Sequence, residues 1–268
     1  MASFSVVNNV ASANAQSNLQ ATSMGLNKAL NRLSSGFRIN QSGDDAAGLA
    51  VANAYRNDVA ILSQGVRNAN DGQSKLQIKD SALANIAGIL DRMATLATQA
   101  ASASNGVDIS KLSDEFSTLT DEIDREAAVA GMTASGSFSV FVSSESTVSN
   151  GAISGTIGAV ETADLGIAQT TFTTVAQAQT ALGEVQDAIS ALGDVQNTIG
   201  TLQNRLTFAI TLSQAQVVNT QAAESRIRDA NVAEESANMT RYQILTQSGI
   251  AALAQANQSS SSVLSLLR

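Results

Sequence analysis

The sequence predicts a mainly α-helical fold, a long antiparallel helical coiled-coil or bundle rod that carries a small β-hairpin element. Three observations predict it. The 268 residues contain no proline, where average usage would give about 13, and an internal proline costs a helix about 3 kcal/mol. Apolar residues recur at a mean spacing close to that of supercoiled helices. One segment, residues 131–172, is instead rich in glycine, serine and threonine.

The first helix is expected near the N-terminus and should end at a glycine. Gly36 follows two serines, and glycine adopts the left-handed conformation that terminates many helices without a steric penalty. Apolar residues before it lie at steps of three, four or seven, which places them on one face. The residues of this face that we expect to pack against the last helix are Leu19, Leu26, Leu30 and Leu33.

A second helix is expected to begin at Ser42 and to extend to about Ala103. Ser42 is the expected N-cap, and Asp45, three residues later, completes a capping-box pattern. A heptad repeat of apolar residues follows, which is typical of a coiled-coil seam. A shorter third helix, capped near Ser110, comes next. The rod-seam residues predicted on the second helix are Leu76, Leu83, Leu90 and Met93.

After the third helix the pattern changes to that of a β element. Residues 137–142 alternate between serine and apolar side chains, which predicts a strand. The pair Asn150-Gly151 is the strongest short signal for a hairpin turn. Residues 131–174 are therefore expected to form a small β-rich segment between the third helix and the next.

From Val175 the helical pattern returns and continues to the C-terminus. Its apolar positions cover 35 residues in ten steps, a mean of 3.5, the period of a supercoiled helix. The rod-seam residues expected here are Leu182, Val185, Ile189, Leu192, Ile199, Leu202 and Leu206. The last helix is expected to pack against the first through Tyr242, Leu245, Ile250, Leu253, Leu264 and Leu267.

Acidic residues are confined to the middle of the chain. All 23 lie between Asp44 and Glu235. A charge held away from water costs several kcal/mol unless it is paired, so amphipathic ends without carboxylates indicate burial in a crowded assembly. We therefore expect a polymer subunit.

Composition also excludes several classes of function. An acidic chain of net charge −8 with 3% aromatic residues lacks the cations and stacking side chains of a nucleic-acid binder. Without histidine or cysteine, we expect no enzyme, no metal site and no cofactor. No segment approaches the ~18 apolar residues of a membrane span, and no classical signal peptide is expected.

Separated sequence blocks at both ends resemble bacterial flagellins. The N-terminal blocks are residues 33–40 (LSSGFRIN) and 44–50 (DDAAGLA). The C-terminal blocks are residues 202–206 (LQNRL), 224–230 (ESRIRDA), 253–258 (LAQANQ) and 264–267 (LSLL). Several blocks in the same order are far more specific than one motif, and they indicate a short flagellin without large outer domains.

The resemblance implies an organisation and a function. Residues 1–42 and 229–268 would be terminal helices of the inner filament core, and residues 43–228 a helical rod with helices in 43–130 and 175–228 and a variable segment at 131–174. The implied function is a structural subunit that polymerises into the bacterial flagellar filament used for swimming motility, with terminal helices ordering on assembly. The resemblance also implies type III export to an extracellular filament. Implied partners are further copies of the chain, an export chaperone, and cap and hook-associated proteins.

The resemblance also implies one surface site. In flagellins that the vertebrate innate immune flagellin receptor recognises, an arginine and a leucine on the second helix and a glutamate on the third contact the receptor. Arg92, Leu96 and Glu122 align with them. Arg92 and Leu96 lie outside the predicted seam, so both are expected to face outward. The alternative is an exposed arginine beside a leucine that shields the core.

Three other functions share some of these sequence features. A flagellar hook-filament junction protein of the same superfamily shares the terminal helices but usually carries a larger β-rich insert than the roughly 40 residues available here. A chemoreceptor-like signalling coiled coil shares the heptads but normally depends on a membrane span. A metalloprotease built on the same frame needs a His-Glu-x-x-His helix, and the chain has no histidine.

Overall fold

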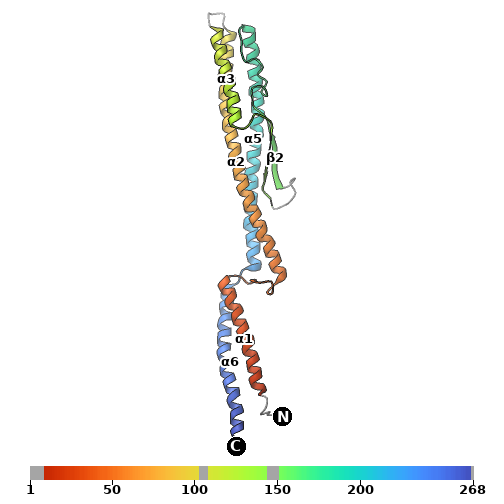
Figure 1. Cartoon of the computed structure of the whole chain (residues 1–268), viewed down its shortest axis with the longest axis vertical. Helices are drawn as coiled ribbons and strands as arrows, with labels where there is room; N and C mark the ends of the chain where they lie inside the picture. The colour runs from red at the N-terminus through yellow and green to blue at the C-terminus, as the bar shows by residue number, and fades with distance from the viewer. Residues whose placement is uncertain (1–8, 103–107, 144–150, 267–268) are drawn as a thin grey trace. The chain divides into compact units, whose positions relative to one another are not determined.

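The computed structural model describes residues 9–102, 108–143 and 151–266, with side chains up to residue 259. The chain divides into two compact units, a terminal unit of Met1–Asn57 with Thr220–Arg268 and a central unit of Asp58–Asn219. Within the described residues the fold is mainly helical with one small antiparallel sheet, as predicted (Figure 1). Its elements are α1 (Val10–Ser35), α2 (Ala46–Ala101), α3 (Ile109–Val129), β1 (Gly136–Phe141), β2 (Ala152–Ile157), α5 (Val175–Arg228) and α6 (Val232–Leu266).

The end of α1 confirms the predicted glycine stop. Gly36 has a φ of 76°, and its N–H donates to the carbonyl of Arg32 at 2.9 Å. The predicted cap of α2 was wrong, because Ser42 lies in a turn and α2 begins four residues later. Asp45 caps the helix instead, since its Oδ1 accepts a hydrogen bond from the N–H of Gly48 at 2.9 Å.

The predicted cap of α3 was wrong by two residues for a similar reason. The Asp108 carboxylate accepts hydrogen bonds from both the N–H and the hydroxyl of Ser110, at 3.2 and 2.8 Å. A carboxylate next to the free N–H groups of a helix start is favoured by the helix dipole. The Ser110 hydroxyl accordingly holds the pKa of the Asp108 carboxyl below its usual value.

The strands β1 and β2 form the small β element that the sequence predicted. They are antiparallel, with Ser137 opposite Thr156 and Val140 opposite Ile153. The predicted turn residue Asn150 lies outside the described residues.

The core of the central unit lies among α2, α3 and α5, which run side by side in the upper part of Figure 1. The ring of Phe116 on α3 meets that of Phe172 edge to face, with ring centroids 5.3 Å apart. Most predicted rod-seam residues are buried there, and Leu182 is partly buried. The buried ones are Leu76, Leu83, Leu90, Met93, Val185, Leu192, Ile199, Leu202 and Leu206.

One seam residue was predicted wrongly. Ile189 is 38% exposed, and Ala188 beside it is fully buried. Both residues continue a helical repeat between Val185 and Leu192, with steps of three and four in either order. The pattern favoured the larger side chain, whereas α5 turns the smaller one toward its neighbours.

Glycines let the β element approach the helices closely. A Cβ on Gly65 of α2 would lie 2.8 to 2.9 Å from the backbone of Val142, and one on Gly72 would lie 2.8 Å from the side chain of Val140. From α5, the hydroxyl of Ser213 donates to the Val142 carbonyl at 3.1 Å. The segment after β1 is therefore held between α2 and α5 by backbone contact.

Candidate functional site

In the terminal unit the helices α1 and α6 lie side by side (Figure 1). Of the residues predicted to pack between them, five are partly buried, namely Leu19, Leu26, Leu33, Tyr242 and Leu253. For three others the prediction was wrong, because their side chains face outward. These are Leu30, Leu245 and Ile250, with 41, 46 and 56% of their surface exposed. Leu264 lies in α6 but its side chain is outside the described set, as is all of Leu267.

Small residues at the contact between α1 and α6 explain why these larger side chains face outward. Ala29 is the buried residue of α1, and Gly25 lies against the Tyr242 ring, which a Cβ would approach to 2.6 Å. On α6, a Cβ on Gly249 would lie 3.1 Å from Leu19. The leucine pattern did not predict these contacts. A glycine inside a helical pattern was the available signal, since it often marks a close packing contact.

We expect Gly25→Ala to weaken the pairing of α1 with α6. The new methyl group would overlap the rigid Tyr242 ring, and overpacking of this kind typically costs about 1 to 3 kcal/mol. Thermal dissociation of assembled protein measures the effect. Gly249→Ala is the control, because the Leu19 side chain can rotate away, and Tyr242→Leu should restore the Gly25→Ala variant. A variant as stable as the parent would contradict the close contact.

A buried ion pair links the same two helices nearer their connections. Arg32 Nη1 donates to Glu235 Oε1 at 2.9 Å, and the Glu235 side chain is only 10% exposed. The Nε of Arg32 is buried without a hydrogen-bond partner among the described atoms. The attraction between the two charges therefore offsets the hydration that each one loses on burial.

The segments that lead out of α1 and α5 pair beside this ion pair. Phe37 and Asp229 form an isolated antiparallel bridge. The flanking N–H of Ala230 donates to the Gly36 carbonyl at 2.9 Å. The guanidinium of Arg228 lies 4.1 Å from the centroid of the Phe37 ring, a distance typical of a cation–π contact. The two connections are thus joined within the terminal unit.

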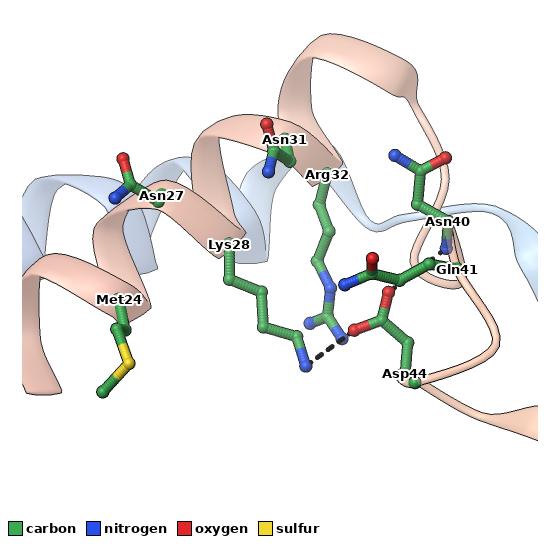
Figure 2. Close-up of a pocket in the computed structure, with 9 residues that line it drawn as sticks. Met24, Asn27, Lys28, Asn31, Arg32, Asn40, Gln41 and Asp44 are labelled. Carbon is green, nitrogen blue, oxygen red and sulfur yellow. Dashed lines mark hydrogen bonds and ion pairs between the residues drawn. The ribbon is translucent and has the colours of Figure 1, made fainter.

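The turn before α2 is tied back to α1 by a second ion pair. A cavity of about 420 Å³ lies at this turn. Figure 2 shows its lining residues, with Lys28 pointing toward Asp44. The distance from Lys28 Nζ to Asp44 Oδ1 is 2.8 Å, and the Asp44 side chain is 9% exposed. The N–H of Asn40 also donates to Asp44 Oδ2, at 3.3 Å. These donors hold the pKa of the Asp44 carboxyl below its usual value, Lys28 contributing most.

We expect acid to loosen this turn. A carboxyl whose pKa is lowered on folding stabilises the fold above its unfolded pKa, near 3.9, and loses that contribution as the pH falls through the lower folded value. Amide exchange of residues 36–45 between pH 6 and 2 measures it. Asp44→Asn should exchange faster at pH 6 and vary less with pH, with Asp80→Asn, at an exposed residue of α2, as the comparison. A turn whose exchange follows the same pH profile in both proteins would contradict this.

The outward side of the terminal unit is almost without charge and exposes several large apolar side chains. Over residues 9–27 the chain has no charged side chain, and over residues 236–259 it has only Arg241. A shallow groove of about 440 Å³ between α1 and α6 is lined by uncharged residues, which include the apolar Leu19 and Leu245 and the polar Asn14 and Asn18. The exposed large apolar residues of this outward surface are Val10, Met24, Leu30, Val232, Ile244, Leu245 and Ile250.

The three residues aligned with a receptor site do not all face outward. The side chains of Arg92 and Glu122 are 52 and 41% exposed. Leu96 is fully buried, so its expected orientation was wrong. The physical reason is that α3 covers a second face of α2, and Leu96 joins the same buried cluster as Phe116 of α3.

The two exposed residues, Arg92 and Glu122, pair with other residues and not with each other. Arg92 Nε donates to Glu115 at 2.9 Å. Glu122 pairs with Arg125, which holds the pKa of the Glu122 carboxyl below its usual value.

In the described helices no stretch is long and apolar enough to cross a membrane. The part of the chain that the structure describes also contains no group of three or more potential metal ligands.

Comparison with known proteins matches both ends of the chain. Residues 6–134 match the model of the bacterial flagellin N-terminal helical region, and residues 182–267 match that of the bacterial flagellin C-terminal helical region. The chain is 34% identical to flagellin FlaB1 of Treponema pallidum (strain Nichols), covering 95% of this chain and 96% of that protein. It is 36% identical to a flagellin of Halalkalibacterium halodurans, over 91 and 94% of the two chains. A flagellin of Bacillus subtilis (strain 168) is 33% identical, over 97 and 98%.

Proposed function

The chain belongs to the bacterial flagellin family, whose members are structural subunits of the flagellar filament, and we propose that its copies join through the outward surface of α1 and α6. It is a filament subunit and not an enzyme. The observation that supports this choice of surface is the set of exposed apolar side chains on two helices that carry no charge over residues 9–27 and only Arg241 over residues 236–259. Burying such a surface yields roughly 25 cal/mol per Å² and leaves few charges unpaired.

We propose in addition that the inner filament core comprises residues 1–42 and 229–268, and that these ends become fully ordered on assembly. In a single copy, residues such as Met24 and Ile250 stay more than half exposed. Helices in proteins gain most of their stability from tertiary packing, and neighbouring copies would supply it here. Amide exchange should therefore be fast at both ends of the dilute monomer and slow in the filament.

Electron microscopy of the purified chain after addition of short seeds tests the assembly role. The full chain should grow into long helical tubes, and a chain lacking residues 1–42 and 229–268 should not. Tubes grown from the truncated chain would refute the proposed role of the ends. A full chain that forms only short assemblies would favour the hook-filament junction alternative.

Point variants test the outward surface itself. Ile244→Glu places a carboxylate on the exposed face of α6, where Ile244 is 57% exposed, and should prevent growth because the charge would lose its water on assembly. Val129→Glu, at a residue of α3 that is 72% exposed, is the matched control and should still grow. Normal growth of the Ile244→Glu chain would argue against this surface.

Members of the family form the extracellular flagellar filament. For this chain we propose export by the flagellar type III route, with an export chaperone, cap and hook-associated proteins as partners. The apolar residues of the first helix, which carries no charge before Lys28, support the chaperone proposal, because they need a cover before assembly. Co-purification of the chain, before its export, with a cytoplasmic chaperone is the direct check.

We also propose that Arg92 and Glu122 are available to the vertebrate innate immune flagellin receptor. Their exposure supports this, whereas the burial of Leu96 removes one of the three expected contacts. A reporter-cell assay with the monomer should give a signal that Arg92→Ala weakens. No signal from the parent chain would contradict receptor recognition.

A further inference from the structure

We propose that the thioether of Met24 is an oxidation site that controls whether a monomer can join the filament. The inference rests on the proposed filament function, because Met24 belongs to the outward surface of α1 and α6. The reagent is a two-electron oxidant such as hydrogen peroxide. Oxidation at Met24 should prevent a free monomer from being added, whereas a subunit that is already in the filament should be protected.

The composition leaves few side chains that peroxide can oxidise. The chain has no cysteine, no tryptophan and no histidine, and it has five methionines. No thiol competes for the oxidant in such a chain. The methionine thioethers are therefore the side chains that react first.

Burial separates the methionines from one another. Met24 on α1 is 62% exposed, whereas Met93 on α2 is fully buried and Met132, which follows α3, is 1% exposed. Met239 on α6 is partly buried, and Met1 lies outside the described residues. A thioether reacts only where the reagent can reach the sulfur. Among the described methionines, Met24 is thus the one that a dissolved oxidant reaches most easily.

The monomer should tolerate the oxidised side chain. Figure 2 shows the Met24 side chain projecting from α1 on the same side as Lys28. More than half of its surface is already in water, so the new oxygen is hydrated there. The pairing of α1 with α6 runs through other residues, such as Gly25 against Tyr242. Oxidation should therefore leave the two helices paired.

The step transfers one oxygen atom from the oxidant to sulfur. The sulfur lone pair attacks hydrogen peroxide, the O–O bond breaks, and a sulfoxide and one water molecule result. The thioether loses the two electrons that the peroxide gains. A flexible apolar side chain thereby becomes polar and chiral. Assembly through the outward surface would strip water from this group, and the loss of hydration disfavours addition.

Peptide mapping after peroxide treatment tests the site. In the dilute monomer, sulfoxide should form at Met24 about tenfold faster than at Met93 or Met132, and assembly into filaments should slow the reaction at Met24. Tandem mass spectrometry separates Met24 from Met1, because both lie in the tryptic peptide of residues 1–28. Equal rates at Met24 and Met93, or equal rates at Met24 in monomer and filament, would overturn the proposal.

Seeded growth of the full-length chain measures the consequence. Monomer oxidised at Met24 should have a critical concentration for elongation about tenfold above that of untreated monomer, a usual effect of burying one polar group without a partner. Methionine sulfoxide reductases A and B with a dithiol return both sulfoxide epimers to the thioether. They should restore growth, and the dithiol becomes a disulfide as water is released. Growth that is unaffected by oxidation at Met24 would overturn the proposal.

Two variants assign the effect to Met24, each compared with its own untreated sample. Peroxide should hardly change the critical concentration of Met24→Leu, because leucine has no thioether. It should raise that of Met239→Leu as it does for the parent chain. Equal inhibition of Met24→Leu and the parent would overturn the assignment. An untreated parent that does not elongate would instead refute the filament function itself.

Discussion

Arg32→Met is expected to lower the stability of the terminal unit by about 3 kcal/mol or more. The variant leaves the Glu235 carboxylate, which is 10% exposed, without its cation, and an unpaired buried charge typically costs about 3 to 5 kcal/mol. Because Arg32 itself keeps 23% of its side chain in contact with water, we expect the lower end of that range. The temperature at which filaments dissociate is the appropriate measurement.

Two controls separate lost pairing from lost packing. Replacing both partners by methionine should recover much of the stability, because an apolar pair of similar volume needs no counter-charge. Arg241→Met removes an exposed cation from α6, the helix that carries Glu235, and should have little effect. If Arg32→Met filaments dissociated at the parent temperature, or if the double variant were no better than the single one, the ion pair would not stabilise the unit.

Gly65→Ala is expected to destabilise the central unit by about 1 to 3 kcal/mol. The new methyl group would lie 2.8 Å from the carbonyl oxygen of Val142, and a backbone atom held by Ser213 cannot move aside as a flexible side chain can. In a unit of this size each 1 kcal/mol shifts the melting temperature by roughly 2 to 4 °C. Thermal unfolding of the monomer should show the loss.

Gly88→Ala is the matched control on the same helix. A Cβ at this position has nothing within 4 Å, so only the better helix propensity of alanine remains, worth up to about 1 kcal/mol. The two substitutions are chemically identical and should shift the melting temperature in opposite directions. Shifts of equal sign and size would show that the segment after β1 does not press against α2.

The outcome at helix ends shows where local signals compete. Gly36 was predicted correctly because the left-handed conformation that it adopts is a property of one residue. Ser42 and Ser110 were wrong because an aspartate stands nearby and accepts the N–H groups instead. Adjacent polar residues can each cap a helix, and the choice depends on contacts such as the one between Lys28 and Asp44.

The rotation of each helix depends on its neighbours. Leu96 was expected outside because a two-helix seam leaves it free, but α3 adds a second covered face. Ala188 is buried where Ile189 was expected, and Ala29 is buried while Leu30 faces outward. In each pair, neighbouring residues fit the apolar repeat almost equally well, so periodicity alone could not separate them.

By itself, the sequence determined the helical class, the position of the β element, the glycine stop of α1 and the family, because each of these follows from local composition, period or ordered sequence blocks. Only the tertiary structure decided which side chains lie between helices and which remain outside, as with Gly25 against Tyr242 and Phe208 in water. The physical reason is that the distance between two helices is set by the smallest residues at their contact, and those residues contribute least to a hydrophobic pattern.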